Sequence, residues 1–175
     1  LGIQGFMAEE NHADYVEVWP VADGFIWKIP RGKETEYGII AEPSKAKILF
    51  DSFLSKNNIK IEKIISAMIP QGLIIPKNDS ITLCGDAAGL TKPWSGGGVI
   101  WGLMAADLLL DSFPDFTKYH RQVKKYFCLK IIILKTFTKI IYFLGFKLSW
   151  LLPNNIKIES DAIFSSLIGP AKKNQ

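Results

Sequence analysis

Residues 81–107 read "ITLCGDAAGLTKPWSGGGVIWGLMAAD", and this stretch decides how the rest of the chain is interpreted. The short, apolar and β-branched run 81–84 is typical of a buried parallel strand. A Gly-Asp turn, a loop with Pro93 and three consecutive glycines then lead into an apolar, helix-like run. We therefore expect a strand over 81–85, a loop over 86–96 and a helix that starts close to Gly98.

The residue types in this stretch favour a particular kind of ligand. Gly85 beside Asp86 lets a ligand approach the backbone while the carboxylate accepts hydrogen bonds from hydroxyls. Glycines 96–98 leave the first amides of the following helix uncovered, which suits an anion or an electron-rich carbonyl. A flavin has this layout, with a ribityl chain next to the N1/O2 edge of its ring. The alternative is a tight turn with close helix packing, in which Asp86 is only a solvated turn residue.

The residues before this stretch predict a small antiparallel sheet and one helix. The first ten residues are typical of a strand, and three further short strands separated by turn residues indicate a meander. These three strands are expected over 14–19, 25–29 and 37–41. A helix opens at Pro43 and ends at Asn57, and the segment 59–76, broken by prolines, predicts a connecting strand. The expected fold class is mixed α/β, of the α+β type.

The chain after the glycines is predicted to be helical. One helix covers about 98–110, and Phe113-Pro114-Asp115 ends it and begins another, on which Tyr119, Val123 and Phe127 face one way. Residues 127–152 are mostly apolar but are interrupted by lysines, so they lack the roughly 20 apolar residues of a spanning helix. They predict either an in-plane helix on an anionic membrane surface or a core helix with snorkelling lysines.

Composition excludes several other classes of function. The net charge of +4 comes almost entirely from lysine, and no arginine-rich run or basic aromatic motif predicts nucleic-acid binding. Cys84 and Cys128 are too few for a disulfide framework, no Cys/His spacing suits a metal, and both thiols are expected to be buried in a reducing cytosol. His12 and His120 are expected at the surface. The chain starts at Leu1 without a secretory signal, and we expect a fragment of a longer protein.

Two ordered motifs resemble a known family. "GDAAGLTKPWSGGGVIWGLMAAD" is similar to the second flavin-contacting motif of the geranylgeranyl reductases, which are FAD-dependent oxidoreductases with a p-hydroxybenzoate hydroxylase-like fold. "GFIWKIPRGKETEYG" looks like the Y/F-x-W-x-F-P…G motif of that family's substrate domain. Phe25, Trp27, Pro30 and Gly38 match it, while Ile29 replaces the usual Phe. The resemblance covers about residues 10–150, and the order of the two motifs makes it stronger than either alone.

The resemblance implies a division of roles. FAD would be held by two groups of residues. Its ribityl–pyrophosphate region would contact Gly85 and Asp86. The pyrimidine edge of its ring would be flanked by Pro93, Gly96, Gly97 and Gly98. A long slot for the isoprenoid chain would be lined by Phe25, Trp27, Ile29 and Pro30. The alternative for these residues is ordinary strand packing. The resemblance assigns no catalytic residue to this chain.

The resemblance also implies an organisation and an activity. Residues 1–76 would belong to an antiparallel substrate-binding domain, 77–112 to a flavin-contacting strand-loop-helix, and 113–175 to a C-terminal helical region. The βαβ unit that holds the ADP half of FAD in this family is missing, so the chain corresponds to the C-terminal half. The expected activity is reduction of prenyl double bonds in isoprenoid lipids, at the cytoplasmic side of a membrane, with electrons from NAD(P)H or a ferredoxin. The alternatives are a flavin monooxygenase of the same fold and a non-catalytic membrane-associated fragment.

Overall fold

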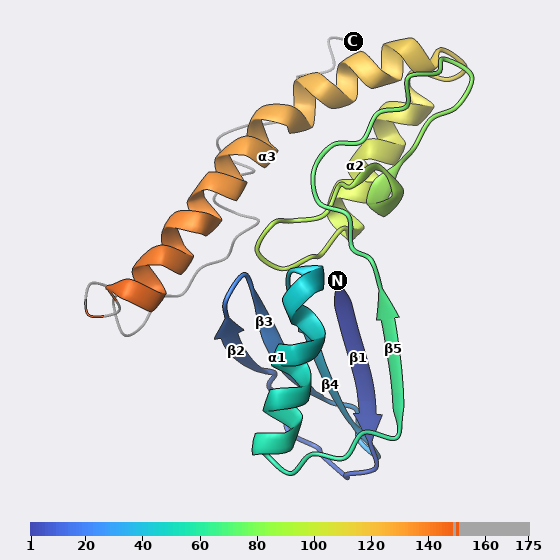
Figure 1. Ribbon diagram of the computed structural model, residues 1–175. Helices are drawn as coiled ribbons and strands as arrows, with labels where there is room; N and C mark the ends of the chain where they lie inside the picture. The colour runs from blue at the N-terminus through green and yellow to red at the C-terminus, as the bar shows by residue number, and fades with distance from the viewer. Residues whose placement is uncertain (149, 151–175) are drawn as a thin grey trace. The chain divides into compact units, whose positions relative to one another are not determined.

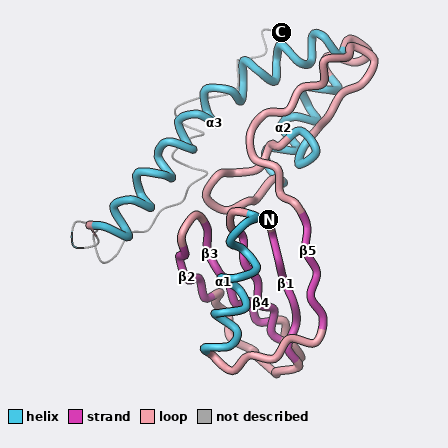
Figure 2. The backbone as a smooth tube through the Cα atoms, in the orientation of Figure 1, coloured by secondary structure: helices cyan, strands magenta, loops and turns pink. Residues whose placement is uncertain are grey.

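The computed structural model of the protein describes residues 1–148 and 150. The first part of the chain forms a five-stranded antiparallel sheet, whose arrangement can be followed in Figures 1 and 2. The strands are β1 (Gly2–Met7), β2 (Glu17–Val21), β3 (Gly24–Pro30), β4 (Thr35–Ile40) and β5 (Lys63–Ala67). Their order in the sheet is β2-β3-β4-β1-β5. The predicted meander is confirmed as β2-β3-β4, although its first strand covers 17–21 and not 14–19. The predicted connecting strand is β5, at the sheet edge next to β1.

Helix α1 (Pro43–Lys56) covers one face of the sheet (Figure 1). Pro43 stands in its first turn, where a missing N–H costs no hydrogen bond. Asn57 ends the helix, and its Nδ2 donates to the Phe53 carbonyl over 2.8 Å, so both predicted ends are confirmed. The core between the helix and the sheet consists of Ile3, Ile26, Tyr37, Ile39, Ala41, Ala46, Phe50 and Leu54. Trp19 of β2 adds to it by packing on Phe53, with ring centroids 5.0 Å apart.

The predicted strand over 81–85 is wrong. Residues 81–84 belong to no strand, and the short 3₁₀ helix η1 (Gly85–Ala88) follows them directly. A parallel strand needs a neighbour to pair with, and the segment instead bonds to helix α3 (Phe116–Lys147). The Tyr119 hydroxyl donates to the Leu83 carbonyl over 3.1 Å, and Thr82 Oγ1 lies 3.0 Å from His120 Nε2. The predicted strand-loop-helix over 77–112 is therefore a turn, a loop and a helix.

The helical predictions for the second part of the chain are confirmed. Helix α2 (Val99–Leu110) begins at the residue after Gly98. Tyr119, Val123 and Phe127 of α3 are all buried, and Phe127 packs on Trp101 of α2 with ring centroids 5.6 Å apart. Residues Leu1–Tyr142 form one compact unit, and the end of α3 from Phe143 onward belongs to a second. The remainder of the predicted C-terminal helical region, 149 and 151–175, lies outside the described residues.

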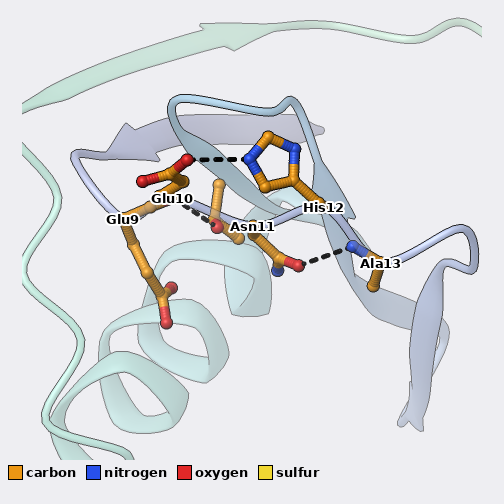
Figure 3. A network of polar contacts seen from close by, with 6 residues as sticks. Glu9, Glu10, Asn11, His12 and Ala13 are labelled. Atoms are coloured by element: carbon orange, nitrogen blue, oxygen red, sulfur yellow. Dashed lines mark hydrogen bonds and ion pairs between the residues drawn. The ribbon is translucent and has the colours of Figure 1, made fainter.

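The cysteines and one histidine differ from expectation. Cys84 is half-buried and Cys128 is exposed, whereas both were expected to be buried. Cys128 is exposed because it follows the buried Phe127 by one residue and so points away from the buried side of α3. His120 is partly buried against Thr82 and is not a free surface side chain. His12 is exposed as expected, with its Nε2 2.8 Å from Glu10 Oε1 (Figure 3).

Candidate flavin and substrate site

The turn after residue 84 depends on glycines. Gly85 has φ +58° and Gly89 has φ +70°, a region that side chains disfavour. The Gly89 N–H donates to the Asp86 carbonyl over 2.9 Å, which closes the turn. A Cβ on Gly85 would lie 3.6 Å from the Cα of Gly102, so η1 approaches the backbone of α2 closely. These glycines therefore meet the requirements of a tight turn and of close helix packing.

Asp86 lies at the start of α2. Its side chain is exposed, yet a Cβ on Gly98 would overlap its carboxylate, so the carboxylate rests directly on the Gly98 backbone. A negative charge here is stabilised by the positive end of the α2 dipole. The structure thus brings two predicted flavin-site positions, Asp86 and Gly98, into contact.

The loop between η1 and α2 closes on itself. The Lys92 N–H donates to the Gly97 carbonyl over 3.0 Å, and the Gly96 N–H donates to the Lys92 carbonyl over 2.9 Å. Pro93 lies within this closed loop and is half-buried. Thr91 is buried and donates to the Pro70 carbonyl over 2.8 Å, which ties the loop to the segment that follows β5. The three glycines differ in exposure: Gly97 is exposed, Gly96 is half-buried and Gly98 is buried.

The loop packs against the sheet at one point. A Cβ on Gly96 would lie 2.6 Å from Cδ1 of Ile40, so the loop backbone rests on this side chain. Ile40 of β4 stands directly opposite Phe25 of β3, and directly opposed residues share a face of the sheet. The glycine loop therefore meets the face that bears Phe25, which is opposite the face covered by α1.

We call this surface the loop-side face. By strand alternation it carries Phe25, Trp27, Ile29, Glu36, Gly38 and Ile40. The rings of Phe25 and Trp27 are 5.9 Å apart. Three of the four predicted substrate-binding residues thus share this face. Pro30, the fourth, alternates to the other side and stands at the end of β3 opposite Thr35.

Trp27 is held by a group of residues that sequence reasoning missed. Its Nε1–H donates to Glu36 Oε1 over 2.9 Å, and Arg31 donates to Glu36 Oε2 from Nε over 2.9 Å and from Nη2 over 2.6 Å. The Glu36 side chain is only 6% exposed. Gly38 lies beneath the indole, because a Cβ there would overlap the ring. In the sequence, the signal was an acid, Glu36, among the apolar residues of 35–40. That strand pairs with β3, which bears Trp27 and is followed directly by Arg31.

The polar surroundings of residues 82–84 are also built by α3. Burial raises the pKa of Tyr119 well above its ordinary value, and the neighbouring Cys84 thiol adds to the rise. The Cys84 Sγ lies 3.9 Å from the Gly102 carbonyl of α2. Within residues 1–148 and 150, no group of three His, Cys, Asp or Glu side chains is placed to hold a metal ion.

Comparison with solved structures gives a relationship at the level of the fold. No protein-family model matches the chain. Among solved structures, the chain is similar to a geranylgeranyl bacteriochlorophyll reductase-like protein from Thermoplasma acidophilum, with 19% sequence identity and a TM-score of 0.58. The match covers 79% of this chain and 42% of that one, so this chain spans less than half the length of its structural neighbour. At this identity the likeness shows a shared fold, in which an antiparallel sheet is followed by C-terminal helices.

Proposed function

We propose that this chain contributes the ring-contacting and substrate-lining part of an FAD-dependent reductase that acts on prenyl double bonds in isoprenoid lipids. The observation that carries the proposal is the contact of Gly96 with Ile40. It joins the glycine loop, suited to the ring of a flavin, to the apolar face that bears Phe25 and Trp27. A bound reduced flavin would supply the hydride for an alkene, and the acceptor must then lie between the loop and this face.

The residues present fit a flavin in two respects. Asp86 offers an exposed carboxylate, an acceptor for ribityl hydroxyls, at the N-terminus of α2. Gly97 offers open backbone. Among the described residues, the only atom within 4 Å of a Cβ placed on Gly97 would be Ser95 Oγ, at 3.4 Å. A flat ring edge can therefore approach this part of the loop. Gly98 and Gly85 serve the same site indirectly, because they allow Asp86 and η1 to lie close to α2.

The loop-side face fits an isoprenoid chain. Phe25, Trp27 and Ile29 follow one another along β3 at every second residue, which makes a linear apolar track. The hydrogen bond to Glu36 uses the polar edge of the Trp27 indole, so its apolar surface remains for a hydrocarbon. Pro30 follows Ile29 in the sequence but alternates to the other face of the sheet, so it is not part of this track. We further propose that the complete enzyme works at the cytoplasmic side of a membrane, with NAD(P)H or a ferredoxin as electron donor.

Two flavin fragments test the cofactor site on this chain without the ADP half of FAD. Riboflavin has the ribityl chain and the ring, whereas lumiflavin has the ring alone. We expect both to bind with quenched fluorescence. Asp86→Ala should weaken riboflavin binding by about ten- to a hundredfold, because a hydrogen bond to a charged group is worth about 1.5–3 kcal/mol. It should leave lumiflavin binding unchanged.

Gly97→Val provides the complementary variant. A branched side chain on the open backbone should weaken both riboflavin and lumiflavin binding, while circular dichroism stays as in the parent. Asp107→Ala, an exposed acid on α2, is the matched control. If neither flavin binds, or if Asp86→Ala binds riboflavin like the parent, the proposal fails and a non-catalytic fragment is the better description. In the holoenzyme, dioxygen consumption without alkene reduction would identify a monooxygenase instead.

A further inference from the structure

The outward side of α3 combines exposed apolar side chains with one sign of charge. The residues Leu129, Ile132, Ile133, Phe137 and Ile140 are 63%, 57%, 46%, 52% and 50% exposed. We call these five residues the outer face. They are distinct from the buried side of the helix, which is formed by Tyr119, Val123, Phe127, Ile131 and Leu134. Helix α3 is thus apolar on two sides, and only one of them is covered by the residues described.

The charges on α3 are all positive. Its sequence, Phe116–Lys147, contains no Asp or Glu. At 100° per residue, Lys139 and Lys130 stand at opposite edges of the outer face, and Lys125 lies within it, one turn before Leu129. Among the ion pairs of residues 1–148 and 150, none includes these lysines. Lys130 Nζ lies 3.7 Å from the centroid of the Tyr126 ring. The outer face therefore carries cations that no acid of the same helix neutralises.

Two contacts fix which side of α3 faces the rest of the compact unit. Lys135 Nζ donates to the Gln71 carbonyl over 3.0 Å, and the Tyr142 hydroxyl donates to the Gly24 carbonyl over 2.9 Å. At 100° per residue Lys135 and Tyr142 lie close together and away from Leu129, Ile133 and Ile140. The hydrogen bonds of Lys135 and Tyr142 therefore turn their side of α3 toward the rest of the compact unit. The outer face consequently points away from that unit.

We propose that the outer face of α3 docks in the plane of an anionic phospholipid bilayer. Its apolar side chains enter the acyl boundary, and the lysines on and beside the face meet the headgroup charges. The charge pattern decides this occupant, since a helix with cations and no acids is complementary to an anionic surface. None of the described helices is long and apolar enough to cross a membrane. The inference is independent of the flavin site.

The test uses flotation of the full chain with vesicles. Phosphatidylcholine vesicles with about one third phosphatidylglycerol should float the protein, whereas pure phosphatidylcholine vesicles should not, and high salt should reduce flotation. Ile132→Ser/Ile133→Ser should lower the bound fraction at least tenfold. Lys125→Gln/Lys139→Gln should lower affinity about fivefold per lysine, for the anionic vesicles only.

Matched controls come from α1. Ile48→Ser changes an isoleucine that is 70% exposed, and Lys47→Gln changes an exposed lysine, so both should float like the parent. Equal flotation with both vesicle types would overturn the proposal. So would outer-face variants that float like the parent. If the chain ignores vesicles but forms concentration-dependent dimers that Ile132→Ser/Ile133→Ser dissociates, the face is covered by a second copy, and the proposal is wrong.

Discussion

The indole N–H of Trp27 donates to Glu36 over 2.9 Å, on a carboxylate that Arg31 holds through its other oxygen. Trp27 and Glu36 come from neighbouring strands of the loop-side face. An aromatic wall beside the glycine loop is thus set in orientation by a nearly buried acid. This relationship accounts for Trp27 structurally, because it fixes the polar edge of the indole.

Removal of this acid should destabilise the fold. Glu36→Ala leaves the indole N–H without its acceptor and Arg31 without its partner, and we expect a loss of about 1–3 kcal/mol in the free energy of unfolding. Glu36→Gln, which keeps an acceptor oxygen, should cost less. Urea denaturation followed by near-ultraviolet circular dichroism measures both. Glu10→Ala, which breaks the exposed pair with His12, should stay within about 0.5 kcal/mol and serves as the control.

Gly38 should tolerate no side chain while Trp27 is present. A Cβ on Gly38 would overlap the indole, so Gly38→Ala should cost about 1–3 kcal/mol despite the usual gain from replacing a strand glycine. In a Trp27→Leu background the same change should cost much less. The double-mutant cycle, measured by urea denaturation, should therefore show a coupling energy of at least about 0.5 kcal/mol. Additive effects would show that the two residues do not touch.

The neighbouring glycines 97 and 98 should respond differently to alanine. A Cβ on Gly98 would overlap the Asp86 carboxylate, so Gly98→Ala should cost about 1–3 kcal/mol of stability. Gly97→Ala, whose Cβ has room, should cost well under about 1 kcal/mol. Asp86→Ala should relieve part of the Gly98→Ala penalty. Thermal unfolding of the three variants and the double variant checks the pattern, which would be refuted if Gly98→Ala melts with the parent.

Tyr119 should make the fold sensitive to alkali. Its pKa is raised by burial, whereas a tyrosine in the unfolded chain titrates near about 10. The stabilisation from the neutral phenol is therefore fully present below about pH 10 and is lost as the pH rises through the raised folded pKa. Tyr119→Phe should cost about 1 kcal/mol at neutral pH, through the lost bond to Leu83.

The same variant should flatten the alkaline loss of stability. Urea midpoints between about pH 9 and 11.5 should fall more steeply for the parent than for Tyr119→Phe. Tyr15→Phe, at a residue that is 62% exposed, should follow the parent throughout. Parallel slopes for the parent and Tyr119→Phe would mean that the buried phenol does not control the alkaline transition.

Local sequence patterns determined much of this protein. The period-2 runs around residues 17–40 and their turns predicted the meander, because neighbouring strands joined by short turns pair antiparallel. Pro43 and Asn57 determined the ends of α1, and the glycines before Val99 determined the start of α2. Each of these signals acts within a few residues, so a single sequence can reveal it.

Tertiary structure alone decided the remainder. The position of β1 between β4 and β5 depends on pairings over long separations, and no local pattern specifies them. Residues 81–84 have the composition of a strand but found no strand to pair with, so their polar groups bond to Tyr119 and His120 of α3. Likewise, the contact of Gly96 with Ile40, on which the proposed site depends, exists only because the loop folds back on the sheet.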